Sequence, residues 1–550
     1  MNKFCSAKEA VASIKDGQTV ASVGVIGWIT PDLVLKSLAA RFLGEGHPRN
    51  LTFYFPCGTG DAVGIRGMDH VAIEGLMKRI VSGSYINPLN PATGKRPELM
   101  RLIHENAIEA YSWPMGASMH WLREVARRSP GYLTEVGLGC YIDPDQTGGR
   151  LTARSVDSLV EKLQFHGKPY LFYPTWKIDV AIIRAGEADE AGNLSFDTEA
   201  LMSSSLELAL AAKACGGTVI TQVAHRVPRH SRRAQTVKIP GQLVDRVVLD
   251  PQQMMTTEIQ YDQAYLGGQP FDSSKIPLVA FGPDKIIARR AAQEVCPGVV
   301  SIFGFGASSE TPLEMAEQGT FDDGAIDQYD FTTEHGPFGG LVMSDWQFSA
   351  NRYPESLLDG AAQFDFIDGG NCEFTALAFA QFDAKGNVNV SKFGSANPGA
   401  GGFIDIAHNA RRLIFTGTFT TAGLRIDVGE NGLSIRKEGK VRKLVNDVEQ
   451  ITYPVRKGVI ERGQRAKVIT ERAVFEVMPE GLVLSEVARG IDVRRDILER
   501  MEFSPARILD PMPFMRDELF VQGRLRRSPP LSEDVQAEDV QALLDYYHIR

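Results

Sequence analysis

Short runs of apolar and β-branched residues, bounded by turn residues, mark the strands expected in this chain. Residues 19–23 and residues 299–303 are two such runs, and each follows a helix-like stretch that ends at a glycine. Each run then enters a glycine loop, at residues 24–27 and at residues 304–306. A short apolar run with turn signals on both sides is typical of a buried strand. The order of helix end, strand and glycine loop therefore occurs twice.

The two occurrences keep a fixed spacing. Gly17 and Gly298 are 281 positions apart, and so are Thr30 and Thr311, each of which is followed by proline. Threonine suits a helix N-cap and proline suits the first helical position, so both Thr-Pro pairs predict the start of a helix.

A second pair of matching segments has a smaller spacing. Residues 189–193 (Asp-Glu-Ala-Gly-Asn) resemble residues 383–387 (Asp-Ala-Lys-Gly-Asn), which lie 194 positions later. The same offset relates the apolar pairs at 219–220 and 413–414. The fall from 281 to 194 means that the first half holds 87 more residues between these landmarks. We expect them as an insertion at about residues 61–163.

The repeated pattern predicts an α/β protein made of two similar open domains, duplicated in one chain. Strands that alternate with helices favour a largely parallel sheet. We expect a first domain at residues 1–270, a second at 284–520 and a C-terminal tail at 521–550. The linker should lie near 267–283, which is rich in Gly, Pro, Ser and Asp. Ligands of such sheets bind at the carboxyl ends of strands, so the cleft between the domains is the expected site.

Composition narrows the function classes. The 550 residues carry a formal net charge of -9, which disfavours sequence-independent binding to nucleic acid. The six cysteines form no Cys-x-x-Cys pair, so reduced thiols are expected, with no disulfide framework and no metal site. We see no secretory signal and no apolar run long enough to span a membrane. A cytoplasmic location without membrane contact is therefore expected.

The strongest candidate for chemistry is the segment 331–340, Phe-Thr-Thr-Glu-His-Gly-Pro-Phe-Gly-Gly. A short β-branched and aromatic run ends at Glu334, and glycines follow at positions 336, 339 and 340. Glycines let a backbone approach a ligand closely, and carboxylates serve as covalent nucleophiles in several enzyme classes. The alternative is an ordinary surface glutamate in a turn, which is the commoner meaning of so short a motif.

Three other glycine segments could line a site. Residues 397–405 contain Gly399, Gly401 and Gly402 before a helix-like stretch, where backbone N–H groups could bind an anion or oxyanion. The alternative there is a plain loop with a helix cap at Asp405. The loops at 24–27 and 304–306 lack the full G-x-G-x-x-G pattern, which argues against a dinucleotide-binding dehydrogenase. Residues 57–61 follow an apolar strand and could place Thr59 in the cleft. Cys57 has no His or Asp at an informative spacing, so a packed thiol is expected.

At these residues the chain resembles the family I CoA transferases, in the single-chain acetate/propionate (3-ketoacid) CoA-transferase branch. Glu334-His-Gly-Pro-Phe-Gly-Gly is similar to that family's E-x-G-x-x-G-G motif. Further similar stretches lie at 386–394, 399–405, 469–475 and 481–490, in the same order, and the resemblance runs from about residue 7 to 505. The loop at 304–308 departs from the usual G-x-G-x-P, because Ser308 stands where proline is common.

The resemblance implies a mechanism and a set of residues. Glu334 would attack the acyl-CoA carbonyl and then carry CoA as a glutamyl thioester. The remaining implied contacts fall into three groups: oxyanion or substrate contacts at Gly401, Gly402 and Thr59, CoA contacts at Gly304, Gly306, Gly399 and Lys392, and acyl-pocket walls at His335 and Phe338. CoA would be a substrate, and neither a cofactor nor a metal is implied.

The implied partners are an acyl-CoA and a short-chain carboxylic acid, of the acetate, propionate or 3-keto acid class. Relatives of this kind are usually homo-oligomers, so a dimer or tetramer is expected. Two alternatives stay open. One is an acyl-CoA hydrolase on the same scaffold, and the other is a non-catalytic α/β protein that senses a CoA ester or a phosphosugar.

Overall fold

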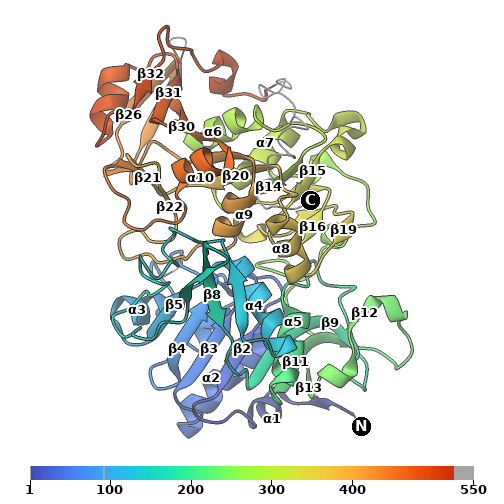
Figure 1. Cartoon of the computed structure of the whole chain (residues 1–550). Coiled ribbons are helices and arrows are strands. Elements are labelled where there is room, and N and C mark those ends of the chain that lie inside the picture. Colours follow the sequence, from blue (N-terminus) through green and yellow to red (C-terminus); the bar gives the residue numbers. More distant parts are fainter. Residues whose placement is uncertain (1, 91–92, 430–431, 526–550) are drawn as a thin grey trace.

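The computed structural model describes residues 2–90, 93–429 and 432–525. The chain forms two halves that stack end to end, with the first half at the bottom of Figure 1 and the second at the top. Helices α4 and α5 of the first half face α8 and α9 of the second across the junction (Figure 1). Within the described ranges, no helix combines the length and the apolar character needed to cross a membrane.

The first half is built on a ten-stranded sheet. Eight strands run in the order β1-β13-β11-β9-β2-β3-β4-β5, and every pair along this path is parallel. β10 and β12 add two antiparallel pairs at the end of β9. The strands are β1 Phe4–Cys5, β2 Thr19–Ser22, β3 Leu51–Phe55, β4 Met77–Ser82, β5 Glu109–Ser112, β9 Val180–Ala188, β10 Leu194–Ser195, β11 Thr218–Arg226, β12 Val237–Ile239 and β13 Arg246–Leu249.

The helices of this half cover the two faces of the sheet. Central strands such as β9 are buried along their whole length, so helices must shield them on both sides. The helices are α1 Ala7–Val11, α2 Asp32–Glu45, α3 Glu98–His104, α4 Met115–Arg127 and α5 Ser205–Ala214. α2 ends at Gly46 in the left-handed conformation, a common helix terminator.

The second half has its own ten-stranded sheet, in the order β19-β16-β15-β14-β20-β23-β29-β30-β31-β32. Its strands are β14 Val300–Phe303, β15 Asp330–Thr332, β16 Pro337–Phe338, β19 Ser356–Leu357, β20 Phe374–Ala378, β23 Arg412–Thr416, β29 Arg465–Ile469, β30 Ala473–Met478, β31 Gly481–Val487 and β32 Arg507–Ile508. Its helices are α6 Pro283–Ala292, α7 Glu310–Glu317, α8 Gly360–Asp368, α9 Phe403–Asn409 and α10 Val455–Arg462.

Smaller sheets decorate both halves. In the second half, three two-stranded sheets pair β17 Leu341–Val342 with β18 Asn351–Arg352, β24 Thr420–Thr421 with β27 Val441–Arg442, and β25 Arg425–Gly429 with β26 Gly432–Lys437. A three-stranded sheet joins β21 Gln381–Asp383, β22 Val388–Asn389 and β28 Leu444–Val445. In the first half, β6 Gly131–Thr134, β8 Lys168–Pro174 and β7 Glu161–Phe165 form a separate antiparallel sheet.

The strand order confirms the duplication. The path β13-β11-β9-β2-β3 in the first half has the same order as β29-β23-β20-β14-β15 in the second. The spacing also agrees, because β2 and β14 start 281 positions apart and β11 and β23 start 194 positions apart. The predicted class, two similar α/β domains with largely parallel sheets, is what the structure shows.

The extra residues of the first half lie between β3 and β9. This stretch holds β4, α3, β5, α4 and the β6-β8-β7 sheet, whereas the second half has only short antiparallel strands and α8 between β15 and β20. β4 and β5 lengthen the parallel sheet at one edge. Most of these elements fall inside the predicted insertion at 61–163. β8 lies beyond residue 163, and α4 also forms part of the junction between the halves.

The prediction that Thr30 and Thr311 cap helices is wrong. α2 begins one residue after Pro31, and α7 begins at Glu310, before the threonine; neither helix has a side-chain cap at its start. The Thr30 hydroxyl instead forms a hydrogen bond of 2.6 Å with the Thr59 hydroxyl. Pro312 is tolerated because it falls in the first helical turn, where a missing N–H costs no hydrogen bond.

The halves are joined by residues 250–282, which contain only two short 3-10 turns, Gln263–Tyr265 and Ser273–Lys275. The predicted boundary between residues 270 and 284 lies in this stretch. Of the predicted tail at 521–550, residues 521–525 are described and the rest lies outside the described residues.

Arg289 of α6 ties the end of the described chain to the second half. Its guanidinium is buried, lies 2.8 Å from Glu314 Oε1, and donates to the carbonyls of Leu519, Val521 and Gly523. Removing one partner of a buried ion pair leaves an uncompensated charge and costs about 3–5 kcal/mol.

We therefore predict that Arg289→Met lowers the thermal midpoint of the protein and speeds amide exchange at residues 519–523. Arg101→Met serves as a control, because Arg101 makes its ion pairs in solvent and such pairs contribute at most about 1 kcal/mol. Differential scanning calorimetry and hydrogen exchange measure both effects. Equal effects of the two substitutions would contradict this account.

Candidate active site

Glu334 lies at the carboxyl end of the second half's parallel sheet. It is the second residue after β15, in the turn that leads to β16. Ile302 of β14 is in register with Thr332 of β15, so Gly304 and Glu334 each lie two residues beyond the last paired residues of adjacent parallel strands. The glycine loop after β14 and the candidate nucleophile thus meet at one edge of the sheet, as expected from their positions after adjacent strands.

Contacts within the second half hold the Glu334 turn rigid. Gly336 has a φ of +95°, and an added Cβ would lie 2.3 Å from the carbonyl oxygen of Leu358, so only glycine fits. Gln363 of α8 donates its amide to the carbonyl of Thr333 at 2.7 Å. The Thr333 hydroxyl donates to the Ser349 carbonyl at 2.7 Å. The backbone on both sides of Glu334 is therefore fixed.

The Glu334 carboxylate is buried, and one of its two oxygens has no hydrogen-bond partner among the described residues. The residue is 8% exposed, and its Oε2 atom makes no hydrogen bond within the described structure. Burial disfavours the charged form and raises the pKa of Glu334 to about 7. A weakly solvated carboxylate is a better nucleophile, and a buried carboxylate without a counter-charge costs folding stability. Such a group is therefore a functional-site candidate.

The glycine segment 399–402 lies directly against this carboxylate. A Cβ on Gly402 would lie 3.1 Å from the Glu334 Cβ, so the two backbones approach as closely as a glycine permits. Gly401 donates its N–H to the Gly83 carbonyl at 2.9 Å, which occupies that donor. The Gly402 N–H donates to no acceptor in the described part of the chain. Of the two predicted oxyanion donors, only Gly402 is therefore left free.

The first half closes the other side of this space. Cys57, which follows β3, places its Sγ 3.8 Å from His335 Nε2 and 3.7 Å from the Ser84 hydroxyl. Both groups are neutral near pH 7, because burial raises the pKa of Cys57 to about 12 and lowers the pKa of His335 to about 3. A neutral buried thiol is a poor nucleophile, in line with the expectation of a packed Cys57.

The structure brings some predicted site residues together and sets others apart. Gly399 packs on Ser84, and His335 lies in the same turn as Glu334. Thr59 is fully buried, and its hydroxyl is paired with Thr30, so its contacts hold the loop after β3 and do not reach Glu334.

The remaining predicted residues, Phe338, Gly306 and Lys392, have other neighbours. Phe338 packs edge to face on Phe366 of α8, with ring centroids 5.0 Å apart. Gly306 has a φ of +102°. Phe305, which lies between Gly304 and Gly306, is half exposed. Lys392 is half-buried in the turn after β22, where its backbone bonds to Asn389.

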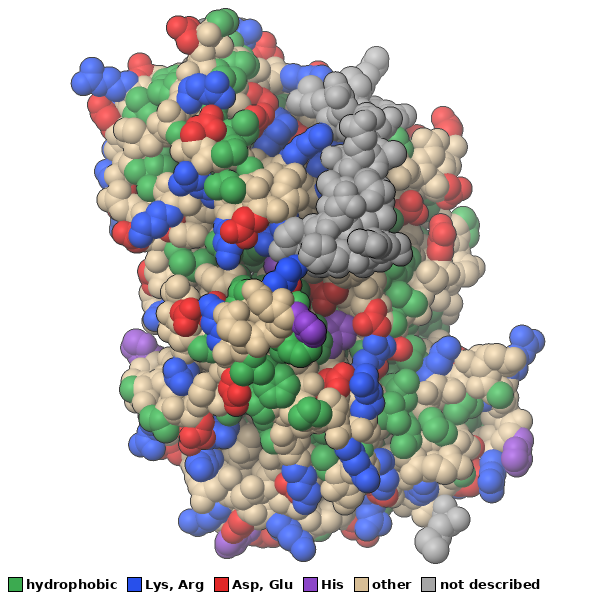
Figure 2. Space-filling model, in the orientation of Figure 1, with side chains coloured by type: hydrophobic (Ala, Val, Ile, Leu, Met, Phe, Trp, Pro, Cys, Tyr) green, Lys and Arg blue, Asp and Glu red, His purple; other side chains and the backbone are tan. Residues whose placement is uncertain are grey.

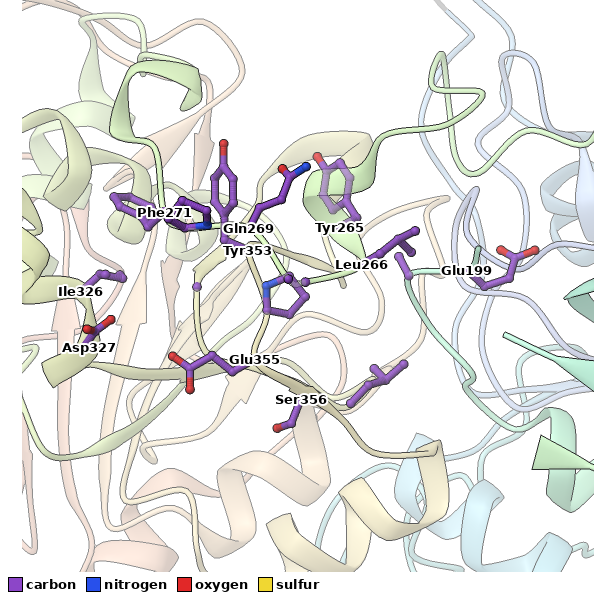
Figure 3. Close-up of a pocket in the computed structure, with 17 residues that line it drawn as sticks. Glu199, Tyr265, Leu266, Gln269, Phe271, Ile326, Asp327, Tyr353, Glu355 and Ser356 are labelled. Atoms are coloured by element: carbon purple, nitrogen blue, oxygen red, sulfur yellow. The ribbon is translucent and has the colours of Figure 1, made fainter. Parts of the chain in front are cut away.

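A separate cavity of about 640 Å³ lies where residues 265–271 of the linker meet residues 353–357. Figure 3 shows Glu199 from the first half, the linker residues Tyr265 and Phe271, and Glu355 after β18 around it. Its lining includes three carboxylates and no lysine or arginine, so it does not suit a phosphate-bearing ligand. Glu334 is not among its lining residues.

Comparison with known proteins decides the family. The coenzyme A transferase profile matches residues 4–250. A caffeate CoA-transferase of Acetobacterium woodii is 37% identical to this chain, over 92% of the chain and 95% of the relative. The chain belongs to the coenzyme A transferase family. Acetate CoA-transferase YdiF of Escherichia coli K12 is 35% identical over 94% of the chain and 95% of its own length.

Solved structures agree with this assignment. The apoenzyme of the acyl-CoA transferase YdiF from Escherichia coli O157:H7 superposes with a TM-score of 0.87 at 33% identity, covering 96% of this chain and 98% of that one. The same protein has been solved as a thioester complex with CoA, again with a TM-score of 0.87. The chain is thus an enzyme, a CoA-transferase, and the predicted resemblance is confirmed.

Two features of this CoA-transferase site could not be predicted from the sequence. His335 and Cys57 meet across the halves although they are 278 positions apart, so no spacing rule could pair them. Asp405 does not cap its own helix, since Gly402 occupies that position; it instead bonds to the first turn of α4 in the other half. The sequence singled out Asp405 as part of the 399–405 segment, but nothing in it indicated that Gly116 would be its partner. Across the described residues, no cluster of three or more His, Cys, Asp or Glu side chains is arranged to hold a metal ion.

Burial of Glu334 should cost stability where the side chain is ionised. Its folded pKa of about 7 exceeds the ordinary value of about 4.5, so the folded state binds the proton more tightly than the unfolded state. Stability is then highest below about pH 4.5 and falls as the pH rises toward 7, by up to roughly 3 kcal/mol.

We predict that Glu334→Gln raises the thermal midpoint at pH 8 and that this gain shrinks toward zero near pH 4.5. Calorimetry of both proteins at the two pH values measures the difference. Glu355→Gln is the control, because Glu355 is exposed and should change the midpoint little at either pH. A gain at pH 8 that persisted unchanged at pH 4.5 would show that the Glu334 charge is not its cause.

Proposed function

We propose that this CoA-transferase moves CoA from a short-chain acyl-CoA to a carboxylic acid through a covalent thioester on Glu334. The observation that carries the proposal is the buried carboxylate of Glu334, whose Oε2 has no hydrogen-bond partner in the described ranges, against the Gly402 backbone. The relative YdiF is named an acetate CoA-transferase, and its solved thioester complex with CoA is consistent with this route.

The chemistry follows from a carboxylate and a thioester of similar energy. Glu334 attacks the acyl carbonyl, the C–S bond breaks, and a mixed anhydride forms with release of the CoA thiolate. The thiolate then attacks the glutamyl carbonyl, which leaves glutamyl-CoA and frees the first carboxylate. A second carboxylate runs the same steps in reverse, so each half-reaction conserves one activated acyl bond. No cofactor or metal takes part in this scheme, and CoA is a substrate.

Gly402 is the group that best fits the developing oxyanion. Its N–H is unused, and it lies beside Glu334, where each tetrahedral intermediate would form. A preorganised donor of this kind lowers an acyl-transfer barrier by roughly 3–4 kcal/mol. Gly401 contributes by holding the loop through Gly83, and Thr59 by holding the loop after β3.

Aromatic acids are the second candidate for the acyl class. The relative from Acetobacterium woodii is named a caffeate CoA-transferase, and it is as similar to this chain as the acetate enzyme is. In this chain the aromatic pair Phe338 and Phe366 lies near the catalytic turn and could stack on such a ring. A hydrolase acting on the same scaffold would need water at the mixed anhydride, which the buried Glu334 disfavours.

We also propose that the enzyme is cytoplasmic and forms a homo-oligomer. The outer face of the β6-β8-β7 sheet offers a contact for a second copy of this chain. Cross-strand register places on that face five apolar side chains, of which three are exposed: Leu133, Leu163, Phe165, Tyr170 and Phe172. Figure 2 shows green side chains gathered in this area, over the position of β8 in Figure 1.

The charges on this face favour a two-fold pairing. Glu161 lies at one end of β7, and Lys168 lies beside Phe165 at the other end. Two copies packed antiparallel would bring each glutamate toward the lysine of the other copy, as an isologous interface requires. β7 is also an edge strand, and exposed apolar edges are rarely left uncovered.

For the activity, we predict that new acyl-CoA forms only when an acceptor acid is supplied. Glu334→Gln should lose this activity by several orders of magnitude, because it removes the nucleophile. It should retain acyl-CoA binding, because the cleft is unchanged. A panel of acetyl-, propionyl-, acetoacetyl- and hydroxycinnamoyl-CoA with matching acids identifies the acyl class. CoA release that is independent of an acceptor would instead indicate a hydrolase.

The same assay gives a pH prediction. Only ionised Glu334 attacks, and its pKa in the unliganded protein is about 7, so kcat/KM should fall about tenfold for each pH unit below 7. A rate independent of pH between 5 and 8 would contradict the assignment of Glu334 as the nucleophile.

For the assembly, we predict that Phe165→Glu with Leu163→Lys lowers the molar mass measured by light scattering. Phe514→Glu is the control, because Phe514 is equally exposed but lies in the second half, away from this sheet. An unchanged mass in the double variant, or a monomeric parent protein, would contradict this surface as the site of self-association.

A further inference from the structure

Helix α4 of the first half begins without a cap of its own. Its N-cap position is Pro114, whose side chain accepts no hydrogen bond. The first N–H groups of a helix have no partner within the helix and must find one elsewhere. In α4 these groups are buried, because Met115 and Gly116 lie inside the junction between the halves.

The missing cap comes from the second half. Asp405 of α9 accepts a hydrogen bond from the Gly116 N–H through Oδ2 at 3.1 Å. The Gly401 carbonyl accepts a second bond from the Met115 N–H at 2.9 Å. A carboxyl group at a helix N-terminus satisfies an orphan donor.

This contact is tight enough to fix the relative position of the two segments. A Cβ on Gly116 would lie 2.3 Å from Asp405 Oδ1, so the carboxyl group fits only because residue 116 is glycine. Asp405 is 1% exposed and follows Gly402 by three residues, within the first turn of α9. Gly402 in turn meets Glu334 at the limit set by its missing side chain.

α4 braces the Glu334 side of the site as well. His120 lies 3.2 Å from Asp368 at the end of α8, and Arg123 pairs with Asp365 on the same helix. α8 also carries Gln363, which holds the Thr333 carbonyl next to Glu334. One helix of the first half therefore contacts the 399–402 loop directly and reaches the Glu334 turn through α8.

We propose that Asp405 is a positioning residue for acyl transfer: by capping α4 from the opposite half, it sets the Gly402 N–H against Glu334. Asp405 contacts no reacting atom and acts through the loop that it anchors. The inference rests on the proposed function, because it assigns to Gly402 the role of donor to the oxyanion.

The test compares Asp405→Leu, which removes the acceptor, with Asp405→Asn, which retains an oxygen that can accept the Gly116 N–H. The readout is the first half-reaction, measured as free carboxylic acid released in a single turnover without acceptor. We expect Asp405→Leu to slow this step by about 100-fold, the loss typical for an oxyanion-hole donor, and Asp405→Asn to stay within about tenfold of the parent. The Kd for acyl-CoA should change less than about threefold in both variants, because the loop and not the CoA cleft is altered.

Asp143→Leu provides a matched control. Asp143 is 2% exposed and accepts the Gly139 and Asp145 N–H groups within the first half alone. Its loss should lower the thermal midpoint and leave the single-turnover rate within about threefold of the parent. If Asp143→Leu and Asp405→Leu slow the reaction equally, the effect is general destabilisation and the positioning role is wrong.

Two further measurements keep the proposal testable if Asp405→Leu does not fold. Gly116→Ala retains Asp405 but forces the two segments apart, and it should slow the half-reaction by a comparable factor. Amide exchange at residues 115–117 should be faster in Gly116→Ala than in the parent and close to the parent in Asp405→Asn, and this readout requires no turnover. Failure of the parent protein to release acid would contradict the proposed function; release by the parent with an unchanged rate in Gly116→Ala and Asp405→Leu would contradict the role of Asp405.

Discussion

The structure depends on one costly arrangement: a carboxylate held out of water with nothing to neutralise it. Glu334 is buried, one of its oxygens has no partner, and its pKa is raised to about 7. A protein retains such a group only if its surroundings are fixed strongly enough to resist solvation. The glycines around it, Gly336 and Gly402, permit that close packing, because any larger residue would meet backbone or the glutamate itself.

The duplicated fold explains how two halves of one chain build that environment. Both halves expose the carboxyl ends of parallel strands, and the loops after β3, β14 and β15 converge there. The halves are not equivalent, however. The second supplies Glu334 and the 399–402 loop, and the first supplies α4, Gly83 and the Cys57 loop that brace them. The site is complete only when both are in place.

The sequence predicted the features that depend on local rules. The repeat spacing indicated the duplication, and glycines after a strand-like run pointed to Glu334 and to residues 399–402. It failed where a side chain had a choice of partners. Thr30 was expected to cap a helix but bonds to Thr59, and Asp405 was considered a cap for its own helix but caps α4. Such choices are set by tertiary packing between segments that are 29 residues apart in the first case and 289 in the second, which local pattern does not encode.

The central claim is that Glu334 itself becomes the carrier of CoA. Incubation with acyl-CoA alone, followed by acid quench, protease digestion and peptide mass mapping, tests it most directly. The account predicts a CoA adduct on the peptide that spans residues 331–340, localised to Glu334 and lost when an acceptor acid is added before the quench. An adduct on Cys57 or on any other side chain, or turnover without any adduct, would contradict it.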